Sequence, residues 1–88
     1  MKLKYKFVVR NIDGNPIAVT VGRDNAKYRS MIKLNNTGAF IFERLANETT
    51  VEAIAGDMVN EYGIPMDEAA SAVAEFVDGM RSRGLIEE

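Results

Sequence analysis

The chain has 88 residues, of which 47% are hydrophobic and 27% charged, and its net charge is −2. This composition is typical of a small globular protein, so we expect residues 1–88 to form a single domain. Because the sequence contains no Cys and no His, disulfides, thiolate metal sites and catalytic centres built on these side chains are excluded. No apolar run approaches the roughly 20 residues that a bilayer crossing requires, and the charged residues 1–6 differ from a signal peptide. We therefore expect a cytoplasmic protein.

Alternation with a period of two dominates the first part of the chain and predicts strands. Residues 2–11 form the first expected strand, with an apolar phase toward a core and a basic phase toward water. The apolar phase consists of Leu3, Tyr5, Phe7, Val9 and Asn11, and the other phase of Lys2, Lys4, Lys6, Val8 and Arg10. Turn residues at positions 13–16 then predict a hairpin.

Two further strands are expected before the pattern changes. Ile17, Val19 and Val21 continue the apolar phase in the second strand, and residues 22–27 are expected to form a polar loop. The third strand is predicted over residues 28–34. Ile32 and Leu34 are its inward pair, whereas Met31 and Lys33 face outward.

From residue 35 onward the apolar residues recur at helical spacing, and caps separate three segments. Asn35 or Asn36 caps a helix over residues 38–46, and Thr49 or Thr50 caps a second helix that ends at Gly63. A third helix is expected from Pro65 to Gly84. The predicted buried stripes are Ile41, Phe42 and Leu45; then Val51, Ile54, Ala55, Met58, Val59 and Tyr62; then Ala69, Val73, Phe76 and Met80.

The third helix carries a second apolar stripe of Ala70, Ala74 and Val77. Small side chains permit another backbone to approach closely, although Ala is also a good helix former at positions that contact nothing. We expect Leu85 and Ile86 to fold back onto the core after this helix. The fold class is therefore α+β and winged-helix-like, a three-stranded antiparallel sheet followed by three helices in the order β-β-β-α-α-α.

No catalytic constellation, cofactor motif or metal-ligand set stands out. The carboxylate pairs Asp57 with Glu61 and Glu75 with Asp78 are interpreted as solvated helix faces. Residues 1–44 carry a net charge near +6 and residues 45–88 near −8. Acidic helices oppose the electrostatic attraction that drives DNA binding, so recognition of nucleic acid through the helices is not expected.

The motifs of the second half resemble those of one known family. They are Leu34-Asn35-Asn36-Thr37-Gly38-Ala39 within residues 32–45, then residues 50–55, Glu61-Tyr62, residues 73–77 and Arg83-Gly84-Leu85-Ile86. This chain is similar to the coenzyme PQQ synthesis protein D (PqqD-like) proteins, also called RiPP recognition elements, over roughly residues 28–86.

The resemblance implies a peptide-binding module and not an enzyme, with no cofactor. Family members bind the leader of a ribosomally made precursor peptide and present it to a modifying enzyme, often a radical SAM protein. The leader adds as a strand beside the third strand and lies against the third helix. On this sequence the implied peptide-binding residues are Ser30, Met31, Ile32 and Lys33 on the strand and Ala70, Val73, Ala74 and Val77 on the helix.

The charges near the third strand and one substitution on the third helix make the peptide-binding hypothesis testable. Lys27, Arg29 and Lys33 near the strand edge favour an acidic leader, mainly through association rate and register. Substitution Ala74→Glu is expected to abolish peptide binding without unfolding the protein. Two alternatives stay open: a winged-helix regulator that binds nucleic acid, and a structural accessory subunit that oligomerises through its sheet edge. Family members can also form homodimers.

Overall fold

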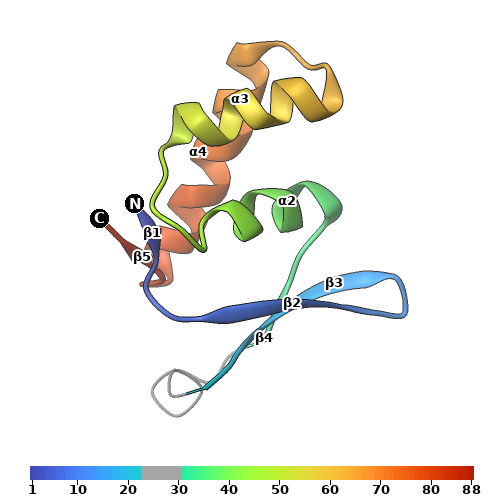
Figure 1. Ribbon diagram of the computed structural model, residues 1–88, viewed down its shortest axis with the longest axis vertical. Helices are drawn as coiled ribbons and strands as arrows, with labels where there is room; N and C mark the ends of the chain where they lie inside the picture. Colours follow the sequence, from blue (N-terminus) through green and yellow to red (C-terminus); the bar gives the residue numbers. More distant parts are fainter. Residues whose placement is uncertain (23–30) are drawn as a thin grey trace.

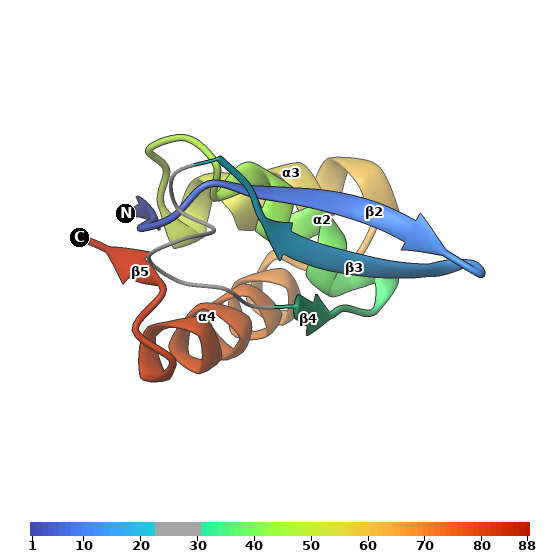
Figure 2. The same ribbon diagram turned by 90° about the horizontal axis from the view of Figure 1, so that it is seen from below.

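The computed structural model describes residues 1–22 and 31–88, in which a sheet forms one layer and the helices the other (Figures 1 and 2). The sheet consists of β2 (Phe7–Ile12), β3 (Asn15–Thr20) and β4 (Met31–Lys33), antiparallel in the order β2-β3-β4. The helices α2 (Asn36–Arg44), α3 (Val51–Tyr62) and α4 (Met66–Ser82) follow. The predicted fold class is confirmed. None of the helices in the described ranges has the length and apolarity needed to cross a membrane.

The N-terminal strand is not continuous, which corrects the prediction for residues 2–11. β1 (Lys2–Leu3) pairs with β5 (Ile86–Glu87), and the chain enters the main sheet only at Phe7. The Leu3 amide donates to the Leu45 carbonyl at 2.8 Å, and the Lys4 amide to the Leu85 carbonyl at 2.7 Å. Partners distant in the sequence therefore hold this segment beside the C-terminus, and the predicted return of Leu85 and Ile86 to the core is confirmed.

The hairpin between β2 and β3 decides which residues of β3 face the helices. Asp13 and Gly14 have φ of 54° and 79°, as both centres of a two-residue type I′ turn require, so Ile12 pairs with Asn15. In this register Val9 lies opposite Ala18, and both face the core. The prediction that Ile17, Val19 and Val21 continue the core phase was wrong. Ile17 lies between Arg10 and Lys33 on the outer face, although it is only 8% exposed.

The caps Asn35 and Thr50 and the stop at Gly63 are as predicted, although α2 spans Asn36–Arg44 and not residues 38–46. The side chain of Asn35 accepts from the Gly38 amide at 2.7 Å and that of Thr50 from the Ala53 amide at 3.1 Å. Gly63 ends α3 in the left-handed conformation with φ of 69°. Pro65 begins α4 without a side-chain cap.

The buried stripes of the helices meet around Phe42. Its ring lies edge-on to Phe7 at 5.1 Å and to Phe76 at 6.4 Å between centroids, which joins the sheet, α2 and α4. Most predicted core residues are buried, whereas Val51, Val59 and Phe76 are half-buried and Tyr62 is exposed. Val77 was assigned to the small-residue stripe, but it belongs to the core. At 100° per residue, Val77 lies only about 40° around the helix from the buried Val73.

Candidate functional site

The strand β4 is an open edge of the sheet. No strand of the described chain pairs with it on the side away from β3. An open edge carries unpaired backbone donors and acceptors, and these can bind another extended chain. The β4 edge is therefore the first part of the candidate site.

The register shows which backbone groups the edge offers. The Leu34 amide donates to the Pro16 carbonyl at 3.0 Å, directly beyond the pairs Ala18 with Ile32 and Ile17 with Lys33. In an antiparallel ladder the residues alternate between facing the partner strand and facing away from it. Ile32 and Leu34 therefore direct their backbone groups toward β3. Met31 and Lys33 direct theirs toward the open edge.

The side chains of the predicted strand residues divide in the same way. Met31 is 67% exposed and Lys33 is exposed on the outer face of the sheet, whereas Ile32 is 3% exposed and packs in the core. Ser30 lies outside the described residues, as do the cationic residues Lys27 and Arg29. The described part of the edge thus offers two residues to a peptide, with one cationic side chain beside them.

On α4 the predicted residues also divide. Val73 and Val77 are 0% and 1% exposed, so their side chains belong to the core and not to the outer surface of the helix. Ala70 and Ala74 are half-buried. The structure therefore leaves only the two alanines of the predicted helix surface accessible.

A cavity of about 340 Å³ lies between α4 and the start of α2, which begins three residues after β4. Its lining consists of Asn35, Thr37, Gly38, Ile41, Ala72, Glu75, Phe76, Gly79 and Met80. At 100° per residue, Ala72, Phe76 and Gly79 occupy one flank of the buried stripe of α4, and Ala70 and Ala74 the opposite flank. This cavity, which Asn35 lines two residues after the end of β4, is therefore on the flank that the sequence analysis did not select.

The spacing i, i+4 and i+7 of Ala72, Phe76 and Gly79 was visible in the sequence, but it did not say which flank faces the start of α2. The close contact between α2 and α4 supplies that answer. A Cβ added at Gly38 would lie 3.0 Å from Cε1 of Phe76 and 3.0 Å from Oδ1 of Asn35. The Asn-Thr-Gly motif thus sets the start of α2 directly against the Phe76 flank.

Comparison with known proteins places this geometry in a family. The sequence matches the family model of coenzyme PQQ synthesis protein D (PqqD) over residues 8–86, which confirms the family that the motifs predicted. No curated protein matches the chain.

Two solved structures share the fold. One is described as lasso peptide synthetase B1 complexed with the leader peptide; it has a TM-score of 0.70 and 22% identity, with 99% of this chain and 96% of that chain covered. The other is described as TbiB1 in complex with the TbiA(beta) leader peptide; its TM-score is 0.73 and its identity 18%, with 99% and 95% covered. At these identities the likeness establishes the fold.

Proposed function

Because the chain belongs to the coenzyme PQQ synthesis protein D (PqqD) family, we propose that it binds the leader of a ribosomally made precursor peptide and presents it to a modifying enzyme. The observation that carries the proposal is the open edge of β4, whose last residue Lys33 lies two residues before Asn35 in the lining of the cavity between α2 and α4. Two structural neighbours that share the fold were solved with leader peptides bound, which supports the same use of this chain.

The geometry suits strand addition. A leader strand beside β4 pairs its backbone with the outward-facing amides and carbonyls of Met31 and Lys33. Alternate leader side chains then point to opposite faces of the sheet. One set lies toward α4 and the cavity beside Phe76, and the other lies on the outer face near Met31 and Lys33.

Affinity then depends mainly on the leader side chains that enter the cavity. Each backbone hydrogen bond contributes only about 0.5–1.5 kcal/mol net, because it replaces a bond to water. Burial of apolar surface contributes roughly 25 cal/mol per Å², or about 1.5–3 kcal/mol for a large aliphatic or aromatic side chain. We therefore expect a leader motif with a large apolar residue at the position that faces Ala72 and Phe76.

In this proposal the protein performs no chemistry, and a cytoplasmic modifying enzyme, of which a radical SAM protein is one class, acts on the peptide. The leader is expected to be acidic, because Lys33 lies on the strand it joins and Lys27 and Arg29 precede that strand in the sequence. A homodimer formed through β4 would occupy the same edge as the leader and would therefore compete with it.

The test is an NMR titration of backbone amides with the leader of a precursor encoded beside this gene, with duplex DNA as a parallel ligand. We expect leader-induced shifts at Met31, Lys33, Ala72 and Phe76, and none from DNA. If DNA shifts amides on the outer face of the sheet and the leader shifts none, the proposal is contradicted and a regulator that binds nucleic acid is favoured.

A further inference from the structure

Within residues 1–22 and 31–88, no strand pairs with β2 on the side away from β3, so β2 is a second open edge of the sheet. The Val21 amide donates to the Lys6 carbonyl at 3.1 Å, and these two residues continue the β2–β3 register. By the antiparallel alternation, Lys6, Val8 and Arg10 direct their backbone groups toward β3. Phe7, Val9 and Asn11 therefore direct theirs toward the open edge.

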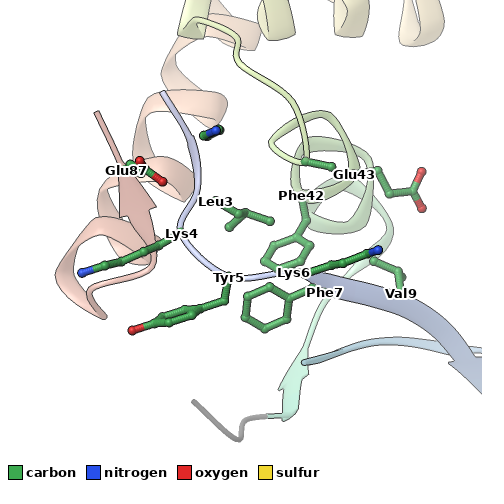
Figure 3. Close-up of a pocket in the computed structure, with 11 residues that line it drawn as sticks. Leu3, Lys4, Tyr5, Lys6, Phe7, Val9, Phe42, Glu43 and Glu87 are labelled. Carbon is green, nitrogen blue, oxygen red and sulfur yellow. The ribbon is translucent and has the colours of Figure 1, made fainter. Parts of the chain in front are cut away.

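A cavity of about 610 Å³ adjoins this edge, and Phe7 and Val9 line it with their side chains. Figure 3 shows Leu3, Phe7 and Phe42 pointing toward one another from β1, β2 and α2. The bend of the chain between β1 and β2 encloses the space. The same two residues thus present backbone groups at the edge and apolar surface in the cavity.

Charge surrounds this apolar surface. Lys2, Lys4 and Lys6 line the cavity, against Glu43 and Glu87. Figure 3 shows the amines of Lys4 and Lys6 on opposite sides of the aromatic pair. On the outer face of β2, the exposed Arg10 lies two residues beyond Val8. An added strand would therefore meet apolar surface with one set of its side chains and cations with the other.

We propose that β2 and this cavity form a second docking site, which binds an extended segment of the modifying enzyme in which acidic and apolar residues alternate. The inference rests on the proposed function, because a module that delivers a peptide has to hold the enzyme while β4 is occupied. β3 separates the two edges, so they are about 10 Å apart at a strand spacing of roughly 4.8 Å. Both edges can be occupied at once.

A second copy of the chain does not meet these requirements. The edge strands β2 and β4 of a second copy contain no acidic residue, so in no register would either set an opposite charge against Lys6 and Arg10. Pairing of β2 with β4 would bring Arg10 toward Lys33. The acidic residues of α3 and α4 are helical, so they offer no extended acidic segment.

The experiment uses the full chain and a synthetic probe, Ac-Glu-Val-Glu-Phe-Glu-Val-Glu-NH2, followed by amide NMR. We expect shifts at Phe7, Val9 and Asn11. Two control peptides define the chemistry: one has Lys in place of every Glu, and the other has the same composition without alternation. Both are expected to bind at least tenfold more weakly.

Two proline variants, one in β2 and one in β4, show which edge of the sheet each peptide binds. Val9→Pro removes an edge-facing amide of β2, and Lys33→Pro removes one of β4; Pro is tolerated at such positions because no ladder bond is lost. We expect Val9→Pro to abolish probe binding and leave leader binding intact, and Lys33→Pro to do the reverse. Should Val9→Pro fail to fold, Ala46→Glu places an acidic group on the exposed rim of the cavity, with Ala53→Glu on exposed α3 surface as its control.

Several results would overturn the inference: no probe binding at millimolar concentration, equal binding of the Lys peptide, or probe shifts confined to Met31 and Lys33. If the leader shifts the Val9 amide, the β2 edge binds the precursor instead. If the chain forms a dimer that the probe dissociates, the β2 edge binds a second copy instead. If the probe binds at β2 but the leader does not bind at β4, only the proposed function is contradicted. If the leader binds at β4 but the probe does not bind at β2, only the second docking site is contradicted.

Discussion

At the scale of single residues, Gly38 has the strictest requirement in the described chain. It is buried at the start of α2, where the Asn35 side chain caps the helix and the Phe76 ring packs from α4. A methyl group there would lie within 3.0 Å of both neighbours, which is closer than ordinary van der Waals contact. The glycine thus permits capping of α2 and contact with α4 at the same position.

Substitution Gly38→Ala is therefore expected to destabilise the protein by about 1–3 kcal/mol, the usual range for overpacking. Urea unfolding followed by circular dichroism measures this as a lower midpoint. Gly56→Ala is the matched control, because Gly56 lies within α3 with nothing within 4 Å of the added methyl. That variant should gain up to about 1 kcal/mol from helix propensity. Equal stability of the two variants would show that the close contact with Phe76 has no energetic consequence.

At the scale of elements, α4 has two accessible flanks beside one buried stripe. The flank with Ala70 and Ala74 was predicted from the sequence, and the flank with Ala72 lines the cavity between α4 and the start of α2. Both alanines at positions 72 and 74 are half-buried, so a glutamate at either position can keep its carboxylate in water. The two positions form a natural pair for comparison.

We expect Ala72→Glu to weaken leader binding at least tenfold, because it places a charge where an apolar leader side chain would be buried. Ala74→Glu should change the dissociation constant less than twofold. Isothermal titration calorimetry with the same leader measures both, and thermal unfolding checks that both variants fold. The opposite order would restore the predicted Ala74 flank as the binding surface.

At the scale of the whole molecule, charge is segregated between the two halves of the chain. The first 44 residues are strongly basic and the last 44 strongly acidic. Exposed charges steer a partner before contact, and salt screens this effect over about 10 Å at 0.1 M. A leader that approaches β4 is therefore attracted by the sheet and repelled by α3 and α4 if it is acidic.

Reversal of the acidic residues of the leader to lysine is expected to lower its association rate about tenfold at low salt, with a smaller change in the dissociation rate. Stopped-flow fluorescence at 20 and 500 mM salt measures both rates. The difference between the two leaders should shrink at high salt. Equal association rates at low salt would contradict an acidic leader.

The sequence by itself determined the features that depend on neighbouring residues. The change of period near residue 35, the caps Asn35 and Thr50 and the stop at Gly63 were all predicted, because each is set within one or two turns of the chain. The motifs around Gly38 and Gly84 identified the family. Met31 and Lys33 were assigned outward correctly, because alternation along a strand is also local.

Only the tertiary structure decided the rest. The break between β1 and β2 depends on Leu45 and Leu85, which lie far along the chain. The inward phase of β3 follows from the register of the two-residue turn, and small residues such as Ala18 face the core there because the helices pack closely above them. Which flank of α4 faces the start of α2, and which edges of the described sheet stay open, are properties of packing between distant segments. Periodicity fixes the faces of one element at a time and carries no information on how two elements meet.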